Sequence, residues 1–436
     1  MSKHENDRRR FGLLALVVGA SLLLAGCTPP AGDAPASHNE PGTPFSAEAT
    51  AELDAALAAA MTLAGASGAE VGVWAPWAGE WTSLAGTTTA GGSRPLKADM
   101  TFRIGTNTTA MTCTVLLKLV DEKRVALTDP VSKYLTRMPD IDGITLGQLC
   151  QGTSGLPDYY GSLHGQFVNN PQRQWPPLEV ISAGMGAGTP VAPGSAWASS
   201  TTGIVLLGMA LQAATNTDWP TLYQKYIFEP LNLTGTSFPA PDDLVIPGSH
   251  PNGYAAAMAA GQPVCETKLD ETSLSNSMFG VAGGVISTIG DMKVWTQALA
   301  EGSLLSKKSA KAQWATVPSP NGPEWKTNGL GTTQVGPLRG SYGSIPGFIT
   351  AGLSDPSSGL TIVVMLNDST AGANFAYSLA LQLASIAAVQ PAVKGQKAPE
   401  LAVPWSAEDA VAAMQAAGVC PTPVPPPAEP TAEPAP

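Results

Sequence analysis

Apolar and polar positions alternate in patterns that predict a folded stretch of helices and strands between two compositionally biased ends. Along 110–121, Met111, Val115 and Leu119 recur at helical spacing on one side. Further helical patterns cover 47–64, 202–214, 289–300 and 374–387, and strand-like apolar runs cover 71–74, 81–84, 348–353 and 361–365. Strands at both ends with helices between them predict an α+β fold, in which a sheet from the terminal segments lies beside a helical insert.

The first 27 residues have the features of a lipoprotein signal peptide. Three arginines at 8–10 precede an apolar run at 11–25 that is short for a membrane-spanning helix. The run ends in Leu-Ala-Gly-Cys, a lipobox whose Cys27 is the predicted lipidation site. This predicts an extracytoplasmic protein that is anchored to the cell membrane by lipid. The arginines before Phe11 also resemble a twin-arginine export signal, so Sec and twin-arginine export both stay open.

Composition divides the rest of the chain. Residues 28–45 are rich in Pro and Ala and predict a flexible tether. Residues 46–390 are expected to form one domain, which 391–420 extend at the C-terminal side. Residues 421–436 consist mainly of Pro, Ala, Glu and Thr, which predicts a disordered tail because such a segment has little apolar surface to bury.

Charge and cysteine content narrow the classes of partner. The formal net charge of −11 and the lack of a basic face argue against nucleic acid as a binding partner. The predicted lipid anchor makes the membrane the expected partner. Four further cysteines, Cys113, Cys150, Cys265 and Cys420, allow three disulfide pairings or buried thiols. None forms a C-x-x-C motif, so neither a metal nor another cofactor is expected.

Six short stretches occur in an order that resembles a known family. They are Phe-Arg-Ile-Gly at 102–105, Thr-Ser-Gly-Leu-Pro-Asp-Tyr at 153–159, Pro-Gly at 193–194, Phe-Glu-Pro-Leu-Asn-Leu at 228–233, His-Pro-Asn-Gly-Tyr at 250–254 and Ala-Gly-Gly-Val-Ile-Ser-Thr at 282–288. Together they resemble the serine β-lactamase-related family, especially secreted serine DD-carboxypeptidases and class C β-lactamases. The resemblance implies a β-lactamase/DD-peptidase-like fold, with an antiparallel sheet packed against helices and a mostly helical lobe.

The three active-site motifs of that family are altered in this chain. The family has S-x-x-K at the start of a buried helix, then Y-x-N, then H-x-G or K-T-G on a strand. The matching positions here are Thr106 and Thr109 for the first motif, Ser199 and Thr201 for the second, and Ser341 and Gly343 for the third. Among these six positions only Gly343 keeps the family residue.

These changes remove the partners that a hydroxyl nucleophile needs. A threonine hydroxyl is hardly ionised near neutral pH, so Thr106 needs a base, and Thr109 cannot serve as one. Lys326-Thr-Asn-Gly imitates K-T-G but lies upstream of the third motif, Lys118 lies too far along the helix, and Tyr160 is expected at the rim of the cleft.

The sequence therefore predicts a catalytically inactive member of this family that binds a peptidoglycan stem peptide or an envelope protein. One alternative is a divergent hydrolase that uses Thr106 as a D-Ala-D-Ala carboxypeptidase, esterase or β-lactamase. A surface scaffold is the other alternative.

Overall fold

An eight-stranded antiparallel sheet forms the centre of the computed structural model, which describes residues 42–420. Its strand order is β2-β1-β12-β11-β10-β9-β8-β7. The strands are β1 Gly68–Ala75, β2 Gly79–Gly86, β7 Val317–Pro318, β8 Lys326–Asn328, β9 Thr333–Val335, β10 Leu338–Ile345, β11 Phe348–Ser354 and β12 Thr361–Leu366. Two-stranded pairs join β3 Phe102–Arg103 to β6 Ile286–Ser287, and β4 Tyr254–Ala259 to β5 Gln262–Asp270.

The sheet brings the two ends of the domain together, as the sequence predicted. Strand β1 pairs with β12 so that Val71 lies opposite Val364, and β10 pairs with β11 so that Gly343 lies opposite Thr350. Alternate residues of β1, such as Val71, pack into the core beneath the terminal helices, while Trp74 packs into the core on the opposite face. Both faces of the sheet are therefore buried.

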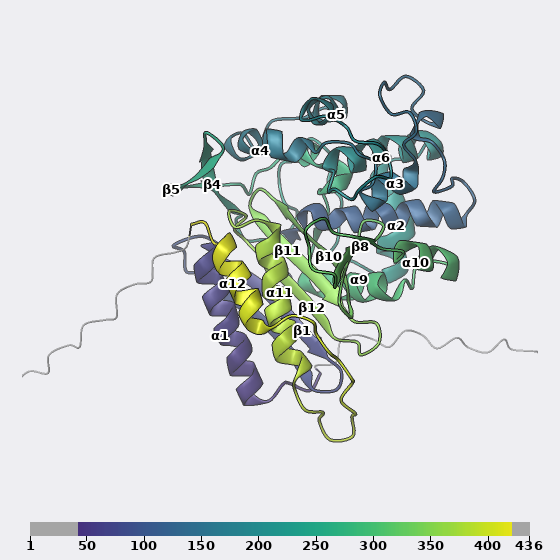
Figure 1. The fold of residues 1–436 in the computed structure, drawn as a ribbon. Helices are drawn as coiled ribbons and strands as arrows, with labels where there is room; N and C mark the ends of the chain where they lie inside the picture. The colour runs from purple at the N-terminus through teal and green to yellow at the C-terminus, as the bar shows by residue number, and fades with distance from the viewer. Residues whose placement is uncertain (1–41, 421–436) are drawn as a thin grey trace, which may run out of the picture. The chain divides into compact units, whose positions relative to one another are not determined.

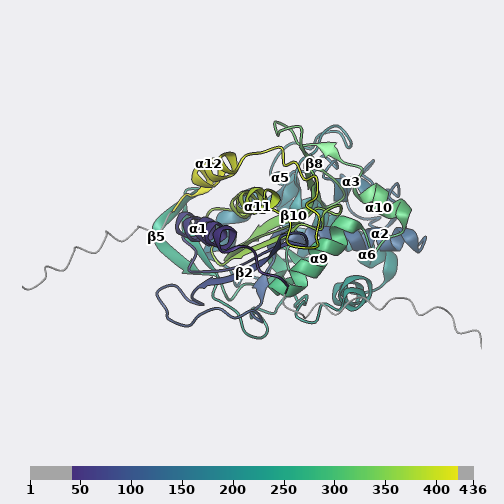
Figure 2. The ribbon, with the colours of Figure 1, turned by 90° about the horizontal axis from the view of Figure 1, so that it is seen from below.

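Helices cover the two faces of the sheet (Figures 1 and 2). Helices α1 Ala47–Ala64, α11 Ala373–Ala388 and α12 Ala407–Ala417 lie together on one face, and α9 Ile289–Glu301 packs against β10, β11 and β12 from the other. The buried helix α2, Thr108–Asp121, runs between the sheet and a mostly helical lobe. The remaining helices are α3 Leu146–Gln151, α4 Tyr159–Asn169, α5 Pro177–Gly186, α6 Thr201–Thr215, α7 Trp219–Tyr223, α8 Glu229–Leu231 and α10 Lys307–Gln313.

The segment 391–420 packs on the same core as the rest of the domain. The Trp405 indole N–H donates to the Leu381 carbonyl of α11 at 3.0 Å, and Met414 of α12 is buried. A disulfide between Cys265 and Cys420 ties the end of this segment to β5.

The second disulfide, Cys113–Cys150, joins α2 to α3. All four cysteines of the described region are thus paired, and none remains as a buried thiol.

The helices and strands expected from the pattern are confirmed, most of them one to three residues longer. The strand expected at 71–74 is β1, Gly68–Ala75, and the helix expected at 110–121 is α2, Thr108–Asp121. No helix among residues 42–420 is long and apolar enough to cross a membrane. The predicted signal peptide with Cys27, most of the tether and the Pro-rich tail lie outside the described residues.

Candidate functional site

Two glycines let strand β10 pass directly over the start of helix α2. Gly105 has φ +57°, and a Cβ there would lie 2.5 Å from the carbonyl carbon of Ser344. A Cβ on Gly343 would lie 2.3 Å from the backbone nitrogen of Asn107 and 2.7 Å from Thr106 Oγ1. Glycine alone fits the left-handed conformation at Gly105, and at both positions it leaves room for the close approach, so these residues fix the helix start against the strand.

Thr106 lies in the short 3₁₀ turn, Gly105–Asn107, that leads into α2. Its hydroxyl oxygen, Oγ1, accepts a hydrogen bond from the backbone N–H of Ser344 at 3.3 Å. Among the described residues, no acidic or basic side chain is hydrogen-bonded to this hydroxyl. The position that matches the family nucleophile is therefore placed beside a strand amide but has no base in contact with it.

Thr109 and its neighbours in the first turns of α2 are bonded to the loop at 281–285. The Thr109 hydroxyl donates to the Ala282 carbonyl at 3.2 Å, and the Thr112 hydroxyl donates to the Val281 carbonyl at 2.6 Å. The Thr109 hydroxyl thus joins the first turn of α2 to this loop.

Ser341 belongs to a buried chain of neutral hydrogen bonds. Its hydroxyl donates to the side-chain oxygen of Asn107, whose amide donates to Thr350 Oγ1 at 3.3 Å. The Thr350 hydroxyl in turn donates to the Ile104 carbonyl at 2.7 Å. A neutral network thus occupies the place where the family has the cationic or polar first residue of its third motif.

Ser199 and Thr201 come from the loop before α6 and the first turn of that helix. Ser200 caps α6 by accepting the Gly203 N–H at 3.1 Å, and the Thr201 N–H donates to Asp158 Oδ1 at 3.1 Å. Asp158 also caps α4, because the same Oδ1 accepts the Tyr160 N–H at 3.1 Å. Burial raises the pKa of Asp158, although these hydrogen bonds oppose the rise.

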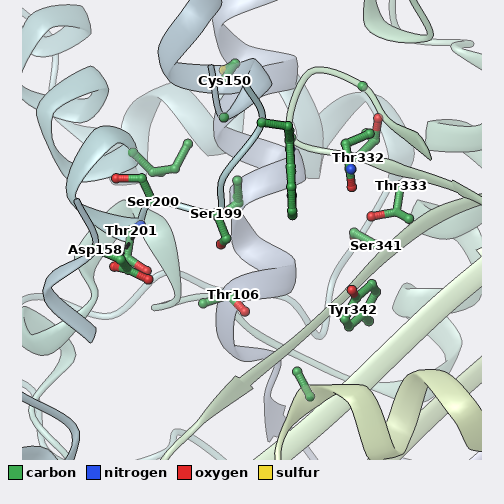
Figure 3. Close-up of a pocket in the computed structure, with 18 of the residues that line it drawn as sticks. Thr106, Cys150, Asp158, Ser199, Ser200, Thr201, Thr332, Thr333, Ser341 and Tyr342 are labelled. Atoms are coloured by element: carbon green, nitrogen blue, oxygen red, sulfur yellow. Dashed lines mark hydrogen bonds between the residues drawn. The ribbon is translucent and has the colours of Figure 1, made fainter. Parts of the chain in front are cut away.

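The altered positions meet in one pocket of about 280 Å³ (Figure 3). Thr106, Thr109, Ser199, Thr201 and Ser341 all line it, and Gly343 lies against Thr106. The rest of the wall combines small polar residues, glycines and several large side chains, namely Leu149, Cys150, Gly152, Asp158, Tyr160, Trp197, Ser200, Ile204, Asn328, Gly329, Gly331, Thr332, Thr333, Tyr342, Ser344 and Ala373.

The lysines and tyrosines considered from the sequence do not complete the site. Burial raises the pKa of Tyr160 to about 12, and hydrogen bonding with Ser344 offsets only part of that rise. Lys118 Nζ donates to the Leu304 carbonyl at 2.8 Å. Lys326 lies on β8 of the same sheet, and its Nζ donates to the Tyr342 hydroxyl at 3.0 Å.

Three residues of the pocket, Asp158, Ser344 and Trp197, were not predicted as site residues from the sequence. Asp158 entered only as part of the stretch 153–159 that resembles the family, Ser344 directly follows the third motif, and Trp197 precedes the second. Ser344 could have been predicted from its position, because the residue after Gly343 continues the strand that passes Thr106. Among residues 42–420, no three His, Cys, Asp or Glu side chains come together in a way that could hold a metal ion.

Comparison with known proteins identifies the family. A family model described as beta-lactamase matches residues 53–385, so the chain belongs to the beta-lactamase family. A curated relative, the D-alanyl-D-alanine-carboxypeptidase/endopeptidase AmpH of Escherichia coli (strain K12), is 32% identical over 222 residues, which are 49% of this chain and 52% of AmpH. The chain thus spans about half the length of this relative.

Solved structures show the same fold. A D-stereospecific amidohydrolase from Streptomyces sp. is 28% identical, with a TM-score of 0.63 over 72% of this chain and 94% of that chain. The D-amino acid amidase from Ochrobactrum anthropi SV3, complexed with L-phenylalanine amide, is 24% identical, with a TM-score of 0.62 over 73% of this chain and 91% of that chain. The predicted β-lactamase/DD-peptidase-like α+β fold is therefore confirmed.

Proposed function

We propose that this protein is an extracytoplasmic lipoprotein, anchored through Cys27, whose beta-lactamase-family domain binds a peptide or aminoacyl ligand without cleaving it. The observation that carries the proposal is the hydrogen bonding of Thr106, whose hydroxyl contacts the Ser344 amide but no acid or base among the described residues. A hydroxyl becomes an effective nucleophile only when an adjacent group takes its proton.

The groups near Thr106 are poor replacements for that base. The Thr109 hydroxyl is bonded to Ala282, and a hydroxyl does not accept a proton near neutral pH. Tyr160 acts as a base only as phenolate, and its pKa of about 12 keeps it protonated. Asp158 is held through Oδ1 by two backbone N–H groups and makes no hydrogen bond to Thr106. Acyl transfer without a base, relay or electrophile is expected to be slower by several orders of magnitude.

The edge of strand β10 supports a ligand that contains amide groups. Strand β9 pairs only with Leu338, Arg339 and Gly340, so it leaves the following part of β10 unpaired where it passes the pocket. The Ser344 N–H points from this edge toward Thr106. An extended peptide can bond to such an edge. The relatives are named for D-alanyl peptides and D-stereospecific amides, which suggests a peptidoglycan stem peptide or a D-aminoacyl amide as the ligand.

One observation favours a divergent hydrolase as the second candidate. The Ser344 amide lies beside Thr106 Oγ1, within reach of a carbonyl bound next to Thr106, and negative charge develops on the oxygen of such a carbonyl when its carbon is attacked. A slow hydrolysis through Thr106 would use this donor. The scaffold alternative has no comparable support.

Calorimetry with a peptide ending in D-alanyl-D-alanine, together with chromatography of the same mixture for released D-alanine, tests the proposal. We expect saturable binding and no product. Ser199→Trp, which fills the pocket from an exposed position, should abolish binding, while Ser195→Trp in the same loop but outside the pocket should not. Product that disappears in Thr106→Ala would establish the hydrolase instead, and absence of binding would overturn the proposed ligand class.

A further inference from the structure

A lysine ammonium lies beside one wall of the pocket. Lys326 Nζ donates at 3.0 Å to the hydroxyl of Tyr342, which lines the pocket. The ammonium also lies 4.4 Å from the centre of the Tyr377 ring. Within residues 42–420, no carboxylate forms an ion pair with Lys326. The positive charge next to this wall is therefore not neutralised by an acid of the described chain.

The Tyr342 hydroxyl has a proton to donate. Its oxygen accepts from Lys326, and no described residue accepts a hydrogen bond from its O–H group. The ring is held against Tyr377, with the two ring centroids 4.7 Å apart and the planes 32° from parallel. Because hydrogen bonds in a chain polarise one another, the contact with the ammonium makes Tyr342 a stronger donor toward the pocket.

Strand β8 explains why a cation reaches this wall. Lys326 and Asn328 are two residues apart on β8 and so lie on the same face of the strand, and Asn328 lines the pocket. Ser341, which stands where the family has the first residue of its third motif, is neutral. In the sheet, β9 separates β8 from β10, so Lys326 supplies a charge from two strands away.

The acid of the pocket lies on the opposite wall and is already bonded. Asp158 accepts the backbone N–H groups of Tyr160 and Thr201, and the Thr201 hydroxyl is a further partner. In the view of Figure 3, Asp158 and Tyr342 lie on opposite sides of the pocket with Thr106 between them. An anionic group of a ligand is therefore favoured at the Tyr342 side.

We infer that Tyr342, with Lys326 behind it, binds the C-terminal carboxylate of the ligand, so that the pocket selects peptides with a free carboxylate over their amides. This rests on the proposed function and favours the stem peptide among its ligands. Residues 342 and 344 lie roughly 7 Å apart along β10. An extended peptide whose carbonyl accepts the Ser344 N–H therefore reaches Tyr342 within about two residues. A hydrogen bond from a hydroxyl to a carboxylate is about twice as strong as one between neutral groups.

Calorimetry with N-acetyl-D-alanyl-D-alanine and with its C-terminal amide tests this, because the two ligands differ only at the terminal group. The wild-type protein should bind the carboxylate about 10-fold more tightly or better. Lys326→Met and Tyr342→Phe should each remove most of that preference and change the affinity for the amide much less. Lys308→Met, at an exposed position on α10 outside the pocket, removes the same charge and should keep the preference.

The outcomes separate the two proposals. Equal or tighter binding of the amide by the wild-type protein overturns the carboxylate assignment and leaves the binding function standing. A preference that survives in either variant does the same, and so does an equal loss of both ligands in a Lys326→Met variant with an unchanged thermal midpoint. No binding of either ligand, and none of D-phenylalanine amide, overturns the proposed function itself and the carboxylate assignment with it.

Discussion

A buried carboxyl group on β1 makes the stability of the domain depend on pH. Glu70 is fully buried, and neither of its carboxyl oxygens has a hydrogen-bond partner within the described part of the chain. Burial, with a smaller contribution from the charge of Asp99, raises its pKa from 4.5 to about 8. The folded domain therefore holds this group as the neutral acid at neutral pH.

The sign and size of the effect follow from linkage. Between the two pKa values the folded state keeps a proton that the unfolded state has lost, so the free energy of unfolding falls as pH rises. The stabilisation is fully present below pH 4.5 and is lost by about pH 8. At 1.36 kcal/mol for each pKa unit, the interval of 8 minus 4.5 corresponds to about 4–5 kcal/mol. That is a large part of the roughly 5–15 kcal/mol by which domains are stable.

Urea unfolding at pH 5 and at pH 8, with the disulfides intact, measures this loss in the wild-type protein and in Glu70→Gln. The wild-type domain should be much less stable at pH 8, and the glutamine variant should recover about 4 kcal/mol of the difference. Glu271, whose pKa burial also raises to about 8, should account for a further loss that remains in the variant. Glu266→Gln, at an exposed position, is the control. An identical pH dependence in Glu70→Gln and wild type would refute the reasoning.

Three other changes should have measurable effects. Gly343→Ala should lower the free energy of unfolding in urea by about 1–3 kcal/mol and abolish ligand binding, because its Cβ would lie 2.3 Å from a backbone nitrogen at the start of α2. The control Gly161→Ala on α4, which has open space around the new Cβ, should have neither effect. Replacing Cys113 and Cys150 together by Ala should lower the free energy of unfolding by about 4 kcal/mol, since their disulfide closes a loop with a sequence separation of 37, and an unchanged midpoint would contradict this. Cys27→Ala should move the protein from the detergent phase to the aqueous phase, and unchanged partition would rule out lipidation.

Local pattern was enough to predict most of the helices and central strands. Runs such as 110–121 and 361–365 are long or strongly apolar, and their periodicity depends only on neighbouring residues. Strand β10 was harder to find, because Gly340, Ser341 and Gly343 interrupt its apolar alternation. The disulfide pairing could not be predicted from the sequence either, because Cys265 and Cys420 are 155 residues apart and only the fold brings them together.

For the site, the order of the altered motifs predicted which residues would meet, and the structure brings them to one pocket. The sequence did not predict the hydrogen bonds that these residues make, and those bonds determine their chemistry. The Ser344 amide reaches Thr106 across 238 residues, and Ser341 reaches Asn107 across 234. The carboxylate of Asp158 in the pocket was not predicted for the same reason. Its local sequence indicates only a helix cap, and the packing of α4 against α6 places it at the pocket wall.

The central claim, that the pocket binds without forming an acyl-enzyme, is tested most directly by intact-mass measurement of the unmodified protein after incubation with benzylpenicillin. The lack of a base at Thr106 predicts that the mass stays that of the free protein, and that Thr106→Ser also stays unlabelled. A covalent penicilloyl adduct on the wild-type protein that is absent from Thr106→Ala would contradict the account and establish Thr106 as a working nucleophile.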